Sequence, residues 1–314
     1  MSTMGKNNCR EFMAEALVGG EACNRIAALR APQARACPVV FSSPHSGRCW
    51  PRDFVERSPL SFDVLRLSED FLVDQLFAAA PACGFWLYAA QRPRAWLDLN
   101  RDPRELDPEM FADRLPADAV IESERVRAGL GVIPRIVAEG MEIHDRPLTW
   151  KEGRRRLSEG YYPWHMGLQA LLEGLRRRWG QAVLVDCHSM PASAARSMTP
   201  LGGRKPHIIL GDGEGRSCSP LLMDVLHDLF AREGYTVSRN RVYTGGFITR
   251  HYGLAGLGFQ AIQIEINREL YMEEGICRTT AGFDELKAAI TRVLAALPER
   301  LRPLWNDIRR EAAE

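Results

Sequence analysis

A short apolar stretch in the second half of the chain constrains the fold most. Residues 183–188 read Val-Leu-Val-Asp-Cys-His, and a serine, a methionine and a proline follow. Such a run is typical of a buried central strand, and the break after it marks the strand's carboxyl end. Open α/β sheets bind their ligands at that end. The sequence therefore predicts a buried strand that carries His188 at the ligand-binding edge of a sheet.

Two other stretches have the same pattern. The apolar residues 38–41 lead into Ser-Pro-His-Ser-Gly, which places His45 just after a strand. The apolar residues 261–266 contain one carboxylate, Glu265. Two imidazoles and a carboxylate at strand ends are the residue types of a zinc hydrolase site. A single histidine is more often a structural residue, but two at matching strand ends favour a shared site.

Strand-like and helix-like stretches alternate along the chain. Strands are expected at residues 38–41, 85–90, 95–101, 182–187, 208–210, 235–239 and 261–266, and helices at 63–80, 164–180, 220–233 and 283–297. This alternation predicts a three-layer α/β/α sandwich with a mixed central sheet.

The predicted organisation is one α/β domain over residues 37–314, preceded by a helical extension at residues 1–36. Residues 102–162 are dense in proline, glycine and charge. They are expected to form a long excursion that serves as a pocket wall or lid. A second glycine-rich loop is expected at residues 245–258.

Composition excludes several classes of function. The net charge of the 314 residues is +1, which gives no general attraction to nucleic acid or to a membrane surface. No apolar run approaches the ~20 residues of a transmembrane helix, and the first residues lack the apolar core of a secretory signal. The eight cysteines are scattered, so we expect reduced thiols in a cytoplasmic protein. We also expect a monomer or a small homo-oligomer. Cys187 is expected to be a buried strand residue rather than a catalytic thiol.

The remaining candidate residues are a carboxylate pair and several groups on loops. Glu69 and Asp70 are the nearest acidic pair after His45, so either could supply a third metal ligand, although acidic residues on an amphipathic helix usually face solvent. Glu265 fits a general base, and an ion pair with Arg268 or Arg250 explains it equally well.

Two arginines near one pocket indicate a small acidic substrate, because their forked guanidinium groups match carboxylates. Arg101, which follows Asn100, and Arg250 are the candidates, although either could be an ordinary surface arginine. His251 and Tyr252 follow Arg250 and have either a pocket-shaping or a purely structural role.

Six stretches occur in an order that is specific as a set. They are Ser-Pro-His-Ser-Gly (43–47), Glu-Asp-Phe-Leu-Val-Asp-Gln-Leu (69–76), Leu-Asp-Leu-Asn-Arg (97–101), Asp-Cys-His-Ser-Met (186–190), Gly-Gly-Phe-Ile-Thr-Arg-His-Tyr-Gly (245–253) and Gln-Ile-Glu-Ile-Asn-Arg (263–268). Together they resemble the N-formylglutamate amidohydrolase family. The resemblance implies a fold similar to that of zinc carboxypeptidases. It also implies zinc-dependent cleavage of an N-acyl amide, expected to be a formyl amide, on an acidic amino acid.

The candidate residues have expected roles in such a hydrolase. His45, Asp70 and His188 would hold one Zn²⁺ per chain, Glu265 would act as general base, and Arg101 and Arg250 would clamp the substrate carboxylates or stabilise the oxyanion. Similar hydrolases of the aspartoacylase group take two ligands from a His-x-x-Glu motif. Here Arg48 stands at the position of that glutamate, so the carboxylate ligand has to come from elsewhere.

Two alternatives stay open. A deacylase or carboxypeptidase for another N-acyl amino acid or short peptide would share the metal site and differ in the wall at residues 102–160. A non-catalytic carboxylate-binding protein would keep the fold without the metal.

Overall fold

The computed structural model describes residues 25–198 and 203–305 of the chain. Contacts between Cα atoms divide the chain into two compact units. Unit 1 comprises Met1–Ala28, His45–Glu69 and Ala90–His165, and unit 2 comprises Leu29–Pro44, Asp70–Ala89 and Met166–Glu314. The prediction of one domain over residues 37–314 stays a prediction.

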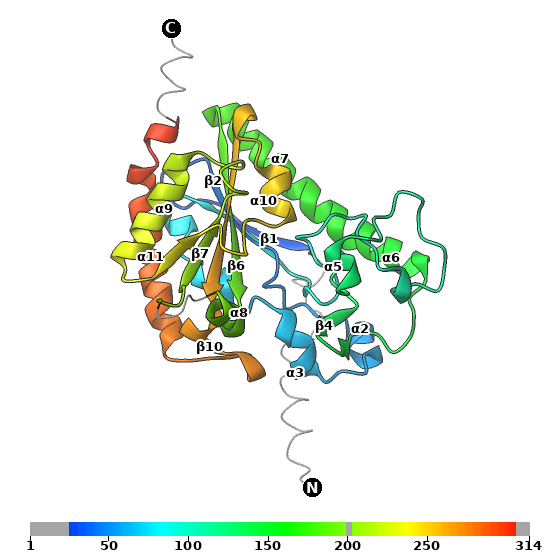
Figure 1. Cartoon of the computed structure of the whole chain (residues 1–314). Coiled ribbons are helices and arrows are strands. Elements are labelled where there is room, and N and C mark those ends of the chain that lie inside the picture. Colours follow the sequence, from blue (N-terminus) through cyan, green and yellow to red (C-terminus); the bar gives the residue numbers. More distant parts are fainter. Residues whose placement is uncertain (1–24, 199–202, 306–314) are drawn as a thin grey trace. The chain divides into compact units, whose positions relative to one another are not determined.

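A seven-stranded sheet forms the centre of unit 2 (Figure 1). Its strands, in spatial order, are β1 (Ala27–Arg30), β3 (Trp86–Ala90), β2 (Val39–Ser43), β6 (Ala182–Met190), β9 (Phe259–Asn267), β7 (Ile208–Gly211) and β8 (Val237–Arg239). The four strands from β3 to β9 run parallel, whereas β7 pairs antiparallel with β9. The predicted mixed sheet is therefore confirmed.

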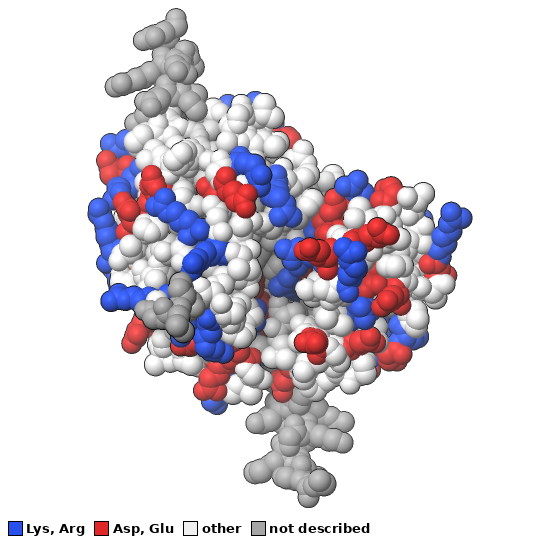
Figure 2. Space-filling view, viewed as in Figure 1, with Lys and Arg blue, Asp and Glu red and all other residues white. Residues whose placement is uncertain are grey.

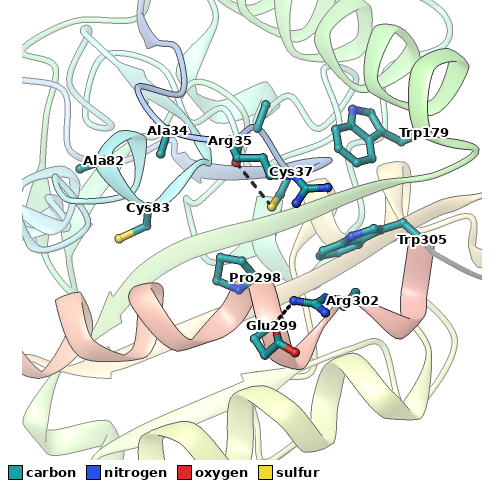
Figure 3. Close-up of a pocket in the computed structure, with 11 residues that line it drawn as sticks. Ala34, Arg35, Cys37, Ala82, Cys83, Trp179, Pro298, Glu299, Arg302 and Trp305 are labelled. Atoms are coloured by element: carbon teal, nitrogen blue, oxygen red, sulfur yellow. Dashed lines mark hydrogen bonds and ion pairs between the residues drawn. The ribbon is translucent and has the colours of Figure 1, made fainter.

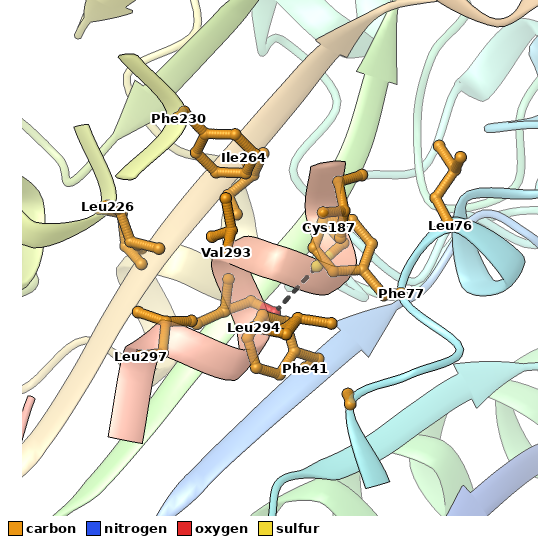
Figure 4. Packing of buried hydrophobic residues seen from close by; sticks show 14 of the residues in the cluster. Phe41, Leu76, Phe77, Cys187, Leu226, Phe230, Ile264, Val293, Leu294 and Leu297 are labelled. Atoms are coloured by element: carbon orange, nitrogen blue, oxygen red, sulfur yellow. Dashed lines mark hydrogen bonds between the residues drawn. The ribbon is translucent and has the colours of Figure 1, made fainter. Parts of the chain in front are cut away.

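Helices flank this sheet. They are α4 (Val73–Leu76), α7 (Tyr162–Trp179), α8 (Ala192–Ser197), α9 (Pro220–Arg232), α10 (Phe247–Tyr252) and α11 (Gly282–Arg300), with short 3₁₀ helices η3 (Pro81–Cys83), η6 (Ala255–Leu257), η7 (Arg268–Leu270) and η8 (Glu274–Ile276). A small hairpin of β10 (Met272–Glu273) and β11 (Arg278–Thr279) precedes α11. Helices α4, α9 and α11 cover one face of the sheet, where they bury a large apolar core (Figure 4). The predicted α/β sandwich is confirmed by this arrangement.

Alternation along the central strands separates the two faces of the sheet. On β6, Val183, Val185 and Cys187 point into the core of Figure 4. The intervening residues of β6 point to the opposite face. Cys187 is fully buried among apolar side chains, and this burial raises the pKa of its thiol well above the usual range. The prediction that Cys187 is a buried strand residue is confirmed.

Unit 1 consists of short elements joined by long connections. They are α2 (Arg52–Arg57), α3 (Phe62–Leu65), η2 (Arg66–Ser68), η4 (Pro108–Met110), α5 (Glu124–Arg127), β4 (Ile136–Ala138), β5 (Met141–Glu142), α6 (Trp150–Arg156) and the π-helical turn η5 (Leu157–Tyr161). The predicted excursion at residues 102–162 thus contains only small elements.

Basic and acidic side chains are intermixed on the face shown in Figure 2, as expected for a net charge of +1.

Three predicted elements differ from the structure. Residues 95–101 form turns rather than a strand, because the amides of Trp96 and Leu97 both donate to the carbonyl of Pro93. The helix expected over 63–80 is interrupted at Leu72, whose φ of 54° is left-handed. The loop expected over 245–258 contains helix α10.

The N-terminal extension was expected to be helical to residue 36. Residues 27–30 instead form β1, an edge strand of the sheet. The pairing available at the sheet edge outweighs the high intrinsic helix propensity of the alanines there, because tertiary context overrides propensity. Residues 1–24 of the extension lie outside the described residues.

Candidate metal centre

Strand β6 carries the first candidate ligand, His188, on the face opposite the apolar core. The pleat places Asp186 on the same face, two residues earlier. The parallel register with β9 pairs His188 with Glu265 and Asp186 with Gln263. Four polar side chains therefore lie side by side on two neighbouring strands at the centre of the sheet.

His45 follows the carboxyl end of β2 by two residues. The backbone after it passes close to another segment, because a Cβ added at Gly47 would collide with the carbonyl group of Arg92. The imidazole is 98% buried and its Nε2 lies 2.8 Å from Oδ1 of Asp98. With Nε2 held by this carboxylate, Nδ1 is the ring nitrogen that is suited to bind a metal ion.

The interruption between η2 and α4 carries the acidic pair. Glu69 points to Arg66, whose Nη2 donates to Oε2 at 3.2 Å. Both carboxylates are buried, at 2% and 1% exposure, but Oδ2 of Asp70 lies 2.9 Å from Nδ1 of His188. The break in the helix therefore separates the two acidic residues, and only Asp70 reaches the histidine on β6.

The structure brings the three predicted ligands together. One ligand atom each from His45, Asp70 and His188 lies within 4.8 Å of the other two, and all three residues are buried. Two imidazoles and one carboxylate match the donor set of catalytic zinc sites, in which a fourth position stays available for water or substrate. The described residues thus contain a buried group that fits a metal ion.

Aspartates hold the second ring nitrogen of each histidine. Nε2 of His188 lies 2.7 Å from Oδ2 of Asp186, in the same way that Nε2 of His45 lies beside Asp98. Burial opposes a charge on His188, but the carboxylates of Asp186 and Asp70 outweigh it and hold the pKa of His188 well above its usual range. Such carboxylate–histidine pairs fix the tautomer and orientation of metal-binding imidazoles.

Asp98 is also the centre of a charge network in unit 1. Its burial would raise the pKa of the carboxyl group, but Arg101, Arg94 and His45 hold that pKa well below the usual range. Nε of Arg94 donates to Oδ2 at 2.9 Å, and the backbone amide of Asn100 donates to Oδ1 at 2.8 Å. Asp98 is therefore a fixed anion beside His45.

Arg101 is buried at 4% exposure. Its Nε donates to the carbonyl of Leu130, its Nη1 donates to the carbonyl of Asn100, and its Nη2 lies 3.5 Å from Asp98. Burial lowers the pKa of Arg101 to about 10, with Asp98 acting in the opposite direction. These contacts give Arg101 a structural role beside Asp98, and a contact with substrate stays a prediction.

Glu265 is 6% exposed, and its Oε1 accepts a hydrogen bond of 2.7 Å from Nε2 of Gln263. The Gln263 side chain in turn accepts from the amide of Gly246, just before α10. Arg268, one of the two cations considered as partners for Glu265, contacts Asp70 at 3.2 Å. The carboxylate of Glu265 therefore lies next to His188 with its orientation set by β9.

Helix α10 carries the last three predicted residues. Arg250 is exposed, and its Nη1 donates to the carbonyl of Gly245. His251 is exposed and stacks on Phe247, and Tyr252 is buried with its ring edge-on to His251. These contacts define the helix and do not decide between a substrate-binding and a structural role.

Sequence reasoning missed Asp98, Asp186, Ser189 and Arg268 as members of the site. Two of them carried a usable signal. Asp186 stands two residues before His188 on a strand, which places both side chains on one face, and Asp98 lies within the Asp-Leu-Asn-Arg stretch. Arg268 carried no local signal, because its contact with Asp70 joins residues 198 positions apart.

Unit 2 also contains a cavity of about 430 Å³ that is lined in part by Trp179, Trp305, Cys37 and Arg302 (Figure 3). None of the predicted site residues lines it. No helix in the described ranges is both long and apolar enough to span a bilayer.

Comparisons with known proteins agree with the geometry. The family model for N-formylglutamate amidohydrolase matches residues 37–272. The chain belongs to this family. N-formylglutamate deformylases of Pseudomonas putida and Pseudomonas aeruginosa are 32% and 30% identical to it, each over 76% of this chain and over 82% and 83% of the relative.

Solved structures show the same fold. The crystal structure of N-formylglutamate amidohydrolase from Ralstonia eutropha JMP134 is 34% identical and superposes with a TM-score of 0.83, covering 88% of this chain and 99% of that chain. A gene product of Agrobacterium tumefaciens, 19% identical, shares the fold with a TM-score of 0.62, covering 93% of this chain and 99% of that chain. The family resemblance of the six short stretches is confirmed.

Proposed function

We propose that this chain is a zinc-dependent deformylase that hydrolyses N-formyl-L-glutamate to glutamate and formate. The observation that carries the proposal is the buried group of His45, Asp70 and His188 in a chain of the N-formylglutamate amidohydrolase family. The relatives from Pseudomonas are named for the same reaction.

One Zn²⁺ per chain would be held by His45, Asp70 and His188. When bound at such a site, zinc polarises the substrate carbonyl and eases the deprotonation of water. The chain's own contribution is to orient the ligands. Asp98 and Asp186 each hold one ring nitrogen of a histidine, so the other nitrogen of each imidazole is directed to the metal.

Glu265 would act as the general base. It accepts the proton of the attacking water and returns it to the amine of glutamate as the carbon–nitrogen bond breaks. Its register position opposite His188 supports this role. The hydrogen bond from Gln263 to Oε1 orients the carboxylate on β9.

The carboxylates of the substrate would be bound by arginine. Arg250, which is exposed on α10, is the candidate for a direct contact, with His251 and Tyr252 shaping the surface beside it. Arg101 and Asn100 would act next to Asp98, where Nη2 of Arg101 lies 3.5 Å from the carboxylate. Arg101 would also assist the developing oxyanion. A monomer or small homo-oligomer in the cytoplasm suits an enzyme for a small acidic metabolite.

Metal content and substrate preference of the purified protein test this proposal. We expect about one zinc per chain, loss of activity with a chelator, and faster hydrolysis of N-formyl-L-glutamate than of N-acetyl- or N-succinyl-L-glutamate. If the protein binds zinc but prefers another acyl group, the proposed substrate is wrong and the chain is a related deacylase. A protein that binds acidic amino acids but no zinc after reconstitution would be a carboxylate-binding protein and would refute the enzyme.

A further inference from the structure

The carboxylate ligand Asp70 differs from the two histidines in how it is held. His188 lies within a central strand and His45 lies two residues after the end of another. Asp70 lies instead in the short connection between η2 and α4, next to the left-handed Leu72. No regular hydrogen-bonding pattern of a helix or strand fixes this residue, so its side chain requires other contacts to keep a defined position.

Those contacts come from the ends of β6 and β9. Arg268 Nη2 and Ser189 Oγ both donate to Oδ1 of Asp70, at 3.2 and 3.1 Å. Nε of Arg268 donates to Ser189 Oγ at 3.1 Å. The three side chains therefore form a closed ring of hydrogen bonds, and each of the three residues is at least 92% buried.

The two carboxylate oxygens of Asp70 have different partners. Oδ1 accepts both donors, while Oδ2 points to Nδ1 of His188 at 2.9 Å. The guanidinium group of Arg268 also places a positive charge 3.2 Å from this buried carboxylate. A charge-assisted hydrogen bond of this kind is strong and directional, so it orients the carboxylate.

We propose that Arg268, together with Ser189, is the positioning residue of the metal site. The pair engages Oδ1 of Asp70 and presents Oδ2 to the metal, in place of the regular strand that fixes His188. This inference rests on the proposed function, since it assumes that Asp70 is a ligand. In this role Arg268 acts on the metal through Asp70.

The affinity for zinc tests this proposal in the full-length protein. We would measure the dissociation constant of Zn²⁺ by competition with a chromophoric chelator for wild type, Arg268→Met, Arg268→Lys and Ser189→Ala. Removing a residue that orients a metal ligand typically weakens binding by about 10- to 100-fold, and we expect a loss of this size for Arg268→Met. A lysine restores one charged donor but cannot reach Asp70 and Ser189 together, so Arg268→Lys should recover part of the affinity.

Arg278→Met is the matched control. Arg278 also pairs with a carboxylate, Glu273, but this pair lies on the exposed β10–β11 hairpin, with side-chain exposures of 66% and 50%. Its substitution should leave the zinc affinity unchanged. The thermal unfolding of the metal-free variants, measured in parallel, separates a loss of fold stability from a loss of metal affinity.

A zinc affinity of Arg268→Met within threefold of wild type, with or without a lower unfolding temperature, would overturn the positioning role. If Arg268→Met does not fold, Ser189→Ala tests the proposal in its place. This substitution removes one hydrogen-bond donor to Oδ1 of Asp70, and the side chain becomes smaller by only one oxygen atom. We expect it to bind zinc at least about threefold more weakly, and unchanged binding would overturn the proposal. Wild-type protein that binds no zinc would instead refute the proposed function, and this inference with it.

Discussion

Glu265→Gln separates catalysis from metal binding at the proposed site. The substitution replaces one carboxylate oxygen by an amide nitrogen and changes the volume very little. The remaining amide oxygen can still accept the hydrogen bond that Gln263 donates at 2.7 Å. Because the ligand group of His45, Asp70 and His188 is unaltered, we expect the variant to fold and to bind about one zinc per chain.

The expected loss is confined to turnover. A general base typically contributes about 10²- to 10⁴-fold to the rate, which corresponds to about 2.7–5.4 kcal/mol of activation free energy at 1.36 kcal/mol per tenfold. We therefore expect kcat for formate release to fall by 10²- to 10⁴-fold. The free energy of unfolding should change by no more than about 1–2 kcal/mol, since the side chain keeps its shape and a hydrogen bond.

The assay is release of formate from N-formyl-L-glutamate by protein whose zinc content is measured in the same sample. Glu269→Gln is a suitable control, because this exposed carboxylate lies only four residues further on and pairs with Lys205. A Glu265→Gln variant that contains zinc and turns over within tenfold of wild type would refute the assignment of Glu265 as base. A variant without zinc would show that Glu265 acts on the metal site itself.

Three other predictions concern the ligand group, the core and a buried histidine. His188→Ala should abolish zinc binding, as measured by metal analysis after reconstitution, because it removes a ligand and leaves the carboxylate of Asp186 without its partner. Leu294→Ala in α11 should lower the free energy of unfolding in denaturant by about 2–5 kcal/mol, since Leu294 is fully buried in the core. Burial, followed by the charge of Arg156, lowers the pKa of His144 to about 3 from 6.5. Protonation below pH 6.5 then favours the unfolded chain, so the free energy of unfolding should fall by up to about 2 kcal/mol from pH 7 to pH 5, and His144→Phe should remove this fall.

The sequence was informative about the sheet for a physical reason. A strand buried on both sides has to be apolar along its length, so residues 182–187 and 261–266 could be assigned directly. The same signal was misleading at residues 95–101. Leu97 and Leu99 alternate with polar residues as in a strand, but local turns satisfy the backbone there and the side chain of Asp98 accepts the amide of Asn100. Alternation describes burial and carries no information about the partner of a backbone amide.

The candidate site could be predicted where ligands lie at strand ends and not where they depend on distant contacts. His45 and His188 follow the chemistry of strand termini. Asp70 was chosen from a pair on an expected helix, and nothing local predicts that Leu72 adopts a left-handed conformation and ends the helix there. The side chain of Asp70 is held by contacts with residues more than 100 positions away, which no local pattern encodes.

The charges around His188 explain why this part of the sheet suits a cation. Asp70 and Asp186 both lie within 3 Å of its ring nitrogens. Of these two carboxylates, Arg268 forms an ion pair with Asp70. In the described part of the chain, Oδ1 of Asp186 is buried without a hydrogen-bond partner. The two carboxylates therefore exceed the positive charge beside them, which raises the pKa of His188. A proton and a metal ion compete for the same imidazole. The negative charge of Asp70 and Asp186 that stabilises the bound proton would therefore also stabilise a metal ion that displaces it.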